Sequence, residues 1–476
     1  MNRNNIWIHA GIAVVLIVMA AVMGQIGRWR GTLRQARTIS ERDVAAPARA
    51  VPPKSGTTAG SPEVLVKFKP GVTLAEIRRI AAGNHDVIED EIESVKGLVA
   101  IDDLDNADAA TVAKQYGDLG DMVVYAEPNF KIELEKAPKV ETSVAGEDDR
   151  SDHRPNDPQF AAQWALNNLG QDGGKAKADI SAVKAWIKTH GSADVVVAVL
   201  DSGVDYNHPD LDGNMWHRPA TMASYTDDEL GNFNDEYGFN ATDNIADPMD
   251  ENGHGTHCAG VIGAEGDNGE GIAGINWDVE IMPLKFMGRG GFGTTKDAIE
   301  AINYTIDRKK NGVNVRVINA SWGSTSYSKA LEDAIRAAGE QGILFVAAAG
   351  NNGTNNDRSP HYPSNYDLPN VISVAALDRS DALTSFSNFG AKTVHIAAPG
   401  KDILSTWLGN DYREASGTSM AAPQVAGVAA LILAEDGDLT VQELRARILK
   451  SVDKLPALNG KVESGGRINA AKALGD

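Results

Sequence analysis

Three short segments carry an aspartate, a histidine and a serine, in that order along the chain. Asp201 lies in VVVAVLDSGVDYNHPDL, His254 in NGHGTHCAG and Ser419 in GTSMAAP. A serine hydroxyl becomes a strong nucleophile when an imidazole accepts its proton and a carboxylate orients that imidazole. The three residue types therefore predict hydrolysis of an acyl bond through a covalent serine intermediate.

The sequence around these residues also predicts groups that stabilise negative charge. Small apolar residues follow His254 and Ser419, so both residues are expected to open helices, with Pro423 in the first turn of the second helix. Free backbone N–H groups at a helix start favour developing negative charge. We expect the backbone N–H of Ser419 and the side-chain amide of Asn351 to form an oxyanion hole.

Two other chemistries fit the same segments less well. His254, His257 and Cys258 have the i, i+3, i+4 spacing of one helix face, but they lack the glutamate and the distant ligand of a zinc hydrolase. An α/β-hydrolase elbow needs G-x-S-x-G, and Ala421 stands at its last position. We expect His257 to be a core residue and Cys258 a small buried side chain.

Short apolar strands alternate with helical segments in the last two thirds of the chain. The expected strands are residues 195–200, 281–286, 315–319, 343–348 and 371–375. Nearly continuous apolar strands of this kind predict an α/β fold with a parallel twisted sheet and helices on both faces. Such sheets place their chemistry at the carboxyl ends of the strands, where Asp201 and Asn351 fall.

A smaller unit precedes this sheet. Strands at 64–68, 98–101 and 122–125, with helices at 74–82 and 109–116, predict an α+β module of ferredoxin-like pattern over residues 63–135. Thr73 and Glu76 form a capping box for the first helix. Residues 31–62 read as a flexible linker and residues 136–156 as an exposed linker open to cleavage, which leaves residues 157–476 for the large domain.

Composition and the N-terminus indicate where the protein works. The 476-residue chain has a formal charge of -20, which argues against a nucleic-acid partner, and its single cysteine excludes an intramolecular disulfide. The apolar run at residues 6–23 indicates a signal peptide or an uncleaved signal anchor within residues 1–30. Several arginines follow the run, and positively charged residues of this kind tend to stay on the cytoplasmic side of a membrane. A cleaved signal peptide and an uncleaved anchor therefore both stay open. The expected location is extracytoplasmic, secreted or membrane-anchored, with membrane contact only through such an anchor.

The three catalytic segments resemble the subtilisin family of serine endopeptidases, over about residues 157–476, and Cys258 resembles the thiol of its thermitase and proteinase K branches. The segments EVLVKFKPGV and VVYAEPNF are similar to the propeptides of bacterial members, which assist folding and inhibit the enzyme until removed. The resemblance implies a monomeric zymogen that cuts itself in the linker and then acts on protein or peptide substrates.

The resemblance also implies how substrates bind. An extended peptide would add as a third strand between Gly291–Gly293, which includes Phe292, and Ser321–Gly323, with Ala349 and Gly350 lining the primary specificity pocket. Trp322 stands where many relatives have leucine and would reshape the pocket for the fourth residue before the cut. Because these segments contain no acidic residue, we expect apolar or aromatic rather than basic residues before the cut.

Calcium is the one cofactor that the resemblance implies, in a structural role. The first expected site takes Asp157, Asp210 and Asn268, with the backbone carbonyls of Glu270 and Ile272. The second takes Asn240, Asp243 and Asp247, where Asn240 replaces an aspartate of the thermitase pattern.

A pseudoprotease that only sequesters peptides is the alternative from the class of binding proteins. No residue in the sequence favours it, because each role needed for acylation is filled. Self-cleavage within residues 135–156 would distinguish the two functions.

Overall fold

The computed structural model describes residues 63–135, 153–227 and 231–476. The apolar run at 6–23, the linker at 31–62 and most of the expected cleavage linker lie outside these residues. Of that linker, His153–Asn156 is described, and Asn156 is held by hydrogen bonds to Asp267.

The N-terminal module is a four-stranded antiparallel sheet with two helices. Its elements are β1 (Glu63–Phe68), α2 (Leu74–Gly83), β2 (Asp86–Glu91), β3 (Leu98–Asp103), α3 (Ala109–Gly117) and β4 (Val123–Pro128). The strand order β2-β3-β1-β4 is that of a ferredoxin-like fold. The capping box of Thr73 and Glu76 forms as expected. Strand β2 was missed because its sequence, DVIEDE, is mostly acidic.

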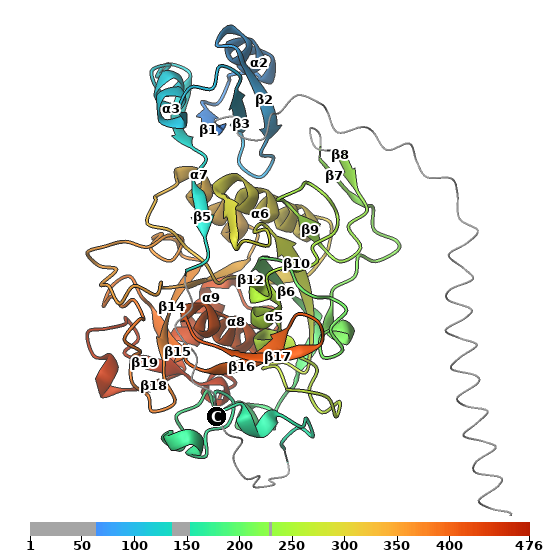
Figure 1. Cartoon of the computed structure of the whole chain (residues 1–476), viewed down its shortest axis with the longest axis vertical. Helices are drawn as coiled ribbons and strands as arrows, with labels where there is room; N and C mark the ends of the chain where they lie inside the picture. Colours follow the sequence, from blue (N-terminus) through green and yellow to red (C-terminus); the bar gives the residue numbers. More distant parts are fainter. Residues whose placement is uncertain (1–62, 136–152, 228–230) are drawn as a thin grey trace, which may run out of the picture. The chain divides into compact units, whose positions relative to one another are not determined.

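A nine-stranded, mostly parallel sheet forms the centre of the large domain, as predicted, in the order β18-β19-β15-β14-β13-β12-β6-β10-β9 (Figure 1). Only β18 and β19 pair antiparallel in it. The strands are β6 (Gly191–Asp201), β9 (Phe239–Asn240), β10 (Asp278–Lys285), β12 (Val315–Ala320), β13 (Leu344–Ala348), β14 (Val371–Leu377), β15 (Ile396–Pro399), β18 (Val452–Lys454) and β19 (Gly466–Ile468).

Helices cover both faces of this sheet, because alternate residues of each strand enter different cores. Val195, Val197 and Val199 of β6 pack in the core with α4 (Ala182–Ala185), α5 (His254–Gly263), α8 (Thr418–Glu435), α9 (Val441–Lys450) and α10 (Ala470–Ala473). Val196, Ala198 and Leu200 pack in the other core, with α6 (Thr295–Lys310) and α7 (Lys329–Glu340). Helix α8 is apolar enough to cross a membrane, but 89% of its apolar window is buried inside the protein, so it is a core helix.

Three two-stranded ribbons complete the fold. Strands β7 (Tyr225–Asp227) and β8 (Gly231–Phe233) form one hairpin, and β16 (Ile403–Trp407) and β17 (Asp411–Ala415) form another. The third pairs β5 (Lys131–Glu133), which follows the N-terminal module, with β11 (Phe292–Thr294) of the large domain.

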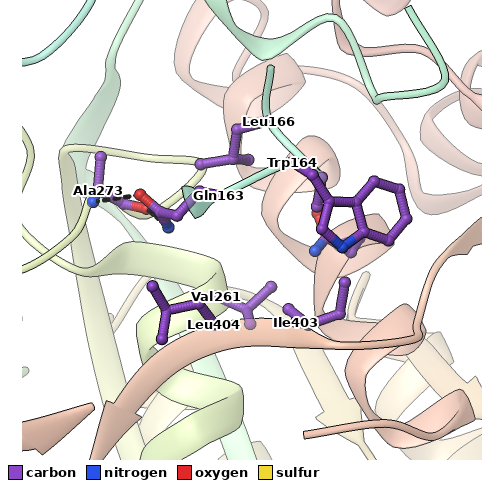
Figure 2. Close-up of a pocket in the computed structure, with 9 residues that line it drawn as sticks. Gln163, Trp164, Leu166, Val261, Ala273, Ile403 and Leu404 are labelled. Atoms are coloured by element: carbon purple, nitrogen blue, oxygen red, sulfur yellow. Dashed lines mark hydrogen bonds between the residues drawn. The ribbon is translucent and has the colours of Figure 1, made fainter. Parts of the chain in front are cut away.

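A small cavity lies between β16 and the segment at residues 163–166 (Figure 2). Its lining is mainly apolar, and Gln163 closes one side through two hydrogen bonds to the backbone of Ala273, at 2.7 and 2.9 Å. None of Asp201, His254 and Ser419 lines it. The cavity is therefore a packing feature, and the site of chemistry lies elsewhere.

Candidate active site

The expected aspartate and histidine meet at the carboxyl end of the central strand. Asp201 ends β6 and is fully buried, and His254 is the first residue of α5. His254 Nδ1 lies 2.7 Å from Asp201 Oδ1. The close approach of the two elements requires a glycine after the histidine, since a Cβ on Gly255 would lie 2.1 Å from the carbonyl oxygen of Gly203.

The environment of His254 tunes its basicity. Burial alone lowers the pKa of the His254 imidazole, but the charge of Asp201 and its hydrogen bond outweigh burial and raise that pKa above the usual value of 6.5. A histidine with a raised pKa is a stronger proton acceptor at neutral pH.

Ser419 is the second residue of α8, and its helix packs against α5. Cys258, one turn beyond His254, places its sulfur 3.5 Å from the carbonyl oxygen of Ser419, so the starts of the two helices are adjacent. In this structure the Ser419 hydroxyl donates to the carbonyl of Ser321, at 2.9 Å. The fold therefore brings together the elements that carry the three residues, with the Ser419 hydroxyl bonded to Ser321 at the end of β12.

The proline in α8 lies one turn later than the sequence predicted. Pro423 is the sixth helical residue, and it lacks the N–H that would bond to the carbonyl of Ser419. That carbonyl accepts instead from the hydroxyl of Ser321, at 2.8 Å. Ser321 thus bonds to Ser419 twice, once through its hydroxyl and once through its carbonyl.

Asp250 is a positioning residue that the sequence did not indicate. Its carboxylate accepts hydrogen bonds from the backbone N–H groups of Gly253 and Thr256, both at 3.0 Å, and from the Thr256 hydroxyl at 2.7 Å. It therefore holds the start of α5, which carries His254. No local spacing pattern distinguishes it from the other aspartates of its loop.

The expected roles of the neighbouring histidine and cysteine are supported. His257 Nε2 lies 3.0 Å from the backbone oxygens of Ile403 and Arg413, and burial lowers the pKa of its ring to about 4. Ligand atoms of Asp201, His254 and Cys258 lie within 4.8 Å of one another. Here His254 Nδ1 and Asp201 Oδ1 are engaged with each other, and the Cys258 thiol faces the carbonyl of Ser419.

Asn351 follows β13 and faces the start of α8. Its Oδ1 accepts from the backbone N–H and the hydroxyl of Thr418, at 2.8 and 2.9 Å. These bonds fix the orientation of the amide and leave its NH₂ group available to a further acceptor. Gly350 beside it has φ +107°, and a Cβ there would lie 2.4 Å from Asn388 Nδ2, so this turn needs glycine.

The two expected substrate-binding segments hold a strand between them, and that strand is β5. Phe292, Gly293 and Thr294 pair with Glu133, Ile132 and Lys131, and Glu133 also bridges to Gly323 on the other side. Ile132 is 2% exposed and packs in the same core as Trp322 and Phe286. The sequence had assigned the residues after 135 to a linker but had not predicted that residues 131–133 would form a strand in this cleft.

The residues of the first expected calcium site lie together. Asp210 is buried and accepts from Asn268 Nδ2 and from the backbone N–H of Ile272, both at 2.9 Å, while the Asp157 carboxylate accepts from Asp267 N at 2.8 Å. The other oxygen of Asp157 is buried and has no hydrogen-bond partner among the described residues. Burial raises the pKa of Asp157 to about 6. An open carboxylate oxygen in an all-oxygen loop fits calcium.

The residues of the second expected calcium site are hydrogen-bonded to one another and to their own loop. The side-chain NH₂ of Asn240 donates to Asp243 Oδ2 at 3.2 Å and to the carbonyl of Asp247 at 3.1 Å. The Asn240 Oδ1 faces inward to the hydroxyl and N–H of Thr242. In contrast to Asp157, no oxygen of this second set is both buried and without a partner among the described residues, so the second site stays a prediction.

Comparison with known proteins identifies the family. A model described as the subtilase family matches residues 192–466. A thermophilic serine proteinase from Bacillus sp. (strain AK1) is 35% identical over 420 residues, which cover 87% of each chain. Thermitase from Thermoactinomyces vulgaris is 36% identical over 322 residues, 68% of this chain and 99% of that one.

Solved structures agree with this assignment. A protease from Pseudoalteromonas arctica matches with a TM-score of 0.54 and 30% identity, covering 67% of this chain and 98% of that one. Fervidolysin from Fervidobacterium pennivorans, a keratinolytic enzyme related to subtilisin, matches in fold with a TM-score of 0.69 and 24% identity, covering 87% of this chain and 61% of that one. The chain therefore belongs to the subtilase family and is a serine endopeptidase with a subtilisin-like fold.

Proposed function

We propose that the protein is an exported serine endopeptidase made as a zymogen, in which Asp201, His254 and Ser419 are the catalytic residues. One observation carries the zymogen proposal: strand β5, at the end of the N-terminal module, lies between the two segments that would bind an extended substrate. Export is supported by the apolar run at residues 6–23.

The chemistry follows from the roles of the three side chains. The Ser419 hydroxyl turns from Ser321 to the imidazole, its oxygen bonds to the carbonyl carbon of the substrate, and His254 takes the proton. Asp201 stabilises the resulting imidazolium through Nδ1. When the C–N bond breaks, His254 returns the proton to the leaving amine, and a water molecule activated by the same imidazole then releases the acyl group.

Asn351 and the backbone N–H of Ser419 would stabilise the tetrahedral oxyanion. The support for Asn351 is the orientation of its amide, because Thr418 takes the oxygen and leaves the NH₂ group to donate. Ala349 and Gly350 would line the primary pocket. The preference for apolar or aromatic residues before the cut stays a prediction from the sequence. The contacts of Glu135 favour a different preference, for an acidic residue.

Self-processing gives a direct test of this function. We expect the wild-type chain to appear on a gel as two fragments divided within residues 135–156 and to react at Ser419 with a fluorophosphonate probe, whereas Ser419→Ala should stay whole and unlabelled. A folded wild-type chain that neither divides nor reacts would favour the peptide-sequestering alternative.

We propose that calcium stabilises the protein at the first site only, through Asp157, Asp210, Asn268 and the carbonyls of Glu270 and Ile272. A cation bound to the folded state alone raises its stability. Chelator should therefore lower the Tm by about 5 °C or more. The drop in Tm on chelation should be lost in Asp210→Asn. It should be retained in Asp243→Asn, the matched variant at the second expected calcium site. An equal response in both variants would contradict the assignment.

The surface between the N-terminal module and α6 buries acidic groups. Burial raises the pKa of Glu63 to about 8 and, with the charge of Glu89, that of Asp102 to about 6, although Lys296 of α6 opposes both shifts. Burial also raises the pKa values of Asp90 in β2 and Glu300 in α6. The charge of Asp90 adds to the rise at Glu300, whereas the hydrogen bond from Glu300 lowers the pKa of Asp90 and opposes the effect of burial there. Asp227 and Glu89 add further negative charge there.

These shifts predict that the cleaved N-terminal module leaves the protease more readily at high pH. A carboxyl group whose pKa is raised in the complex binds its proton more tightly there than after separation. Association therefore takes up protons, and it becomes weaker as the pH rises. Affinity should be full only below the ordinary pKa values of 3.8 for aspartate and 4.5 for glutamate, and it should fall by about tenfold or more between there and pH 8. Size-exclusion chromatography of the processed chain measures the bound fraction. Asp90→Asn should flatten the dependence, and Asp118→Asn, whose side chain is 67% exposed, should not.

A further inference from the structure

The end of strand β5 shows which residue of the N-terminal module approaches the catalytic centre. Ile132 pairs with Gly293, Glu133 bridges to Gly323, and the N–H of Leu134 donates to the carbonyl of Gly291 at 2.7 Å. The chain is therefore held from both sides through Leu134. Glu135 comes next and contacts Asn352, the residue directly after Asn351.

The Glu135 side chain enters a polar pocket. Its Oε1 accepts from the side-chain NH₂ of Asn352 at 3.2 Å and lies 3.2 Å from His361 Nε2. The Glu135 side chain is 20% exposed and that of His361 is 3% exposed. Because the His361 imidazole is buried, its contact with the Glu135 carboxylate is a specific contact rather than a solvated surface pair, and the exposed Asn352 adds a hydrogen bond at the rim.

His361 forms the floor of this pocket, between Gly323 and the turn at Gly350. A Cβ on Gly323 would lie 2.0 Å from His361 Cε1, and a Cβ on Gly350 would lie 3.0 Å from His361 Cδ2. The imidazole thus packs against one glycine of each wall. Gly350 is a residue that the subtilisin resemblance assigns to the primary specificity pocket, so the Glu135 side chain lies in that pocket.

An apolar side chain would suit this pocket poorly. It would leave the buried Nε2 of His361 without the acceptor that the glutamate supplies, and a buried donor without an acceptor weakens binding. Pockets that form hydrogen bonds to a substrate group discriminate strongly against analogues that lack it. Glutamine keeps an acceptor oxygen but not the charge, so a substrate with glutamine before the cut should be cleaved less efficiently than one with glutamate and more efficiently than one with an apolar residue.

We propose that this pocket selects a glutamate before the scissile bond, with His361 and Asn352 as its specificity-determining residues, and that self-processing cuts the bond after Glu135. The inference rests on the proposed function. In that cut, the carbonyl carbon of Glu135 is transferred to the Ser419 oxygen, the bond to the nitrogen of Lys136 breaks, and the Lys136 amine takes the proton from His254. Water then frees the new carboxyl end of Glu135.

Peptide substrates that differ only before the cut give the first test. Acetyl-Ile-Glu-Leu-X p-nitroanilides, which copy residues 132–134, are offered to the processed full-length enzyme with X as glutamate, glutamine, leucine or phenylalanine. We expect kcat/KM for glutamate to exceed that for leucine and phenylalanine by about 100-fold. His361→Ala should reduce this ratio to below about tenfold, and His361→Gln, which keeps a donor, should recover part of it.

Paired variants in β5 give the second test, because Glu133 and Glu135 are two residues apart. Glu135→Ala should slow self-processing by about 100-fold, whereas Glu133→Ala, whose side chain is 64% exposed, should process at the wild-type rate with a new N-terminus at Lys136. Preference for leucine or phenylalanine in a wild-type enzyme that labels with the fluorophosphonate would overturn this inference and leave the proposed function intact. Absence of labelling would instead refute the proposed function.

Discussion

Replacing Asp201 by asparagine is expected to lower kcat by about 10⁴-fold. The amide cannot stabilise the imidazolium of His254, and it favours the wrong tautomer of the ring. The carboxylate lies 2.7 Å from His254 Nδ1 and is fully buried, so water cannot take over its role. Steady-state kinetics on a peptide substrate measure the loss.

The same variant should move the acidic limb of the pH profile. His254 must be neutral to accept the proton of Ser419, so kcat/KM falls as pH drops below the pKa of His254. Asp201 raises that pKa above 6.5, and its loss should shift the limb to lower pH. Asp205→Asn is the control, since Asp205 lies near the same turn but bonds to the N–H groups of Gly409 and Asn207. If the acidic limb of the kcat/KM profile does not move in Asp201→Asn, Asp201 does not set the pKa of His254.

Asn351→Ala is expected to lower kcat by about 10² to 10³-fold with little change in KM, because the oxyanion exists only in the transition state. Asn351→Asp is the more informative variant. It keeps an oxygen that can accept from the backbone and hydroxyl of Thr418, but it removes the NH₂ donor.

The two variants separate donation from anchoring. If donation matters, Asn351→Asp should be at least as impaired as Asn351→Ala, whereas Thr418→Val, which loosens the amide but keeps the donor, should lose less activity. Near-normal turnover in Asn351→Asp would mean that Asn351 only holds the start of α8.

The three proposed catalytic residues could be placed from sequence because local rules fix their surroundings. Asp201 directly follows an apolar strand, and His254 and Ser419 stand at the starts of helices rich in small residues, so each motif carries its own positioning element. The strands at 195–200 and 343–348 are equally clear, since buried parallel strands read as unbroken apolar runs.

Other features depend on partners that are distant in sequence. Strand β5 has only three residues, and it exists because β11 and Gly323 supply its hydrogen bonds. His361 belongs to no motif and reaches the cleft through the path of a loop. Asn240 shows a different limit of sequence analysis. Its position matches that of a cation ligand, but the groups around it determine whether its amide donates or accepts, and in this structure its NH₂ group donates to Asp243 and to the carbonyl of Asp247.

The placement of β5 has a kinetic consequence. Before cleavage, the strand is tethered to its own cleft, so its local concentration there is high and independent of how much protein is present. In the proposed zymogen, cleavage would make rebinding bimolecular, and the freed strand would compete with every other peptide for the same edges. Dilution or digestion of the severed fragment, rather than the first cut, would then determine when a population of molecules begins to work, and a few freed enzymes could trigger the rest.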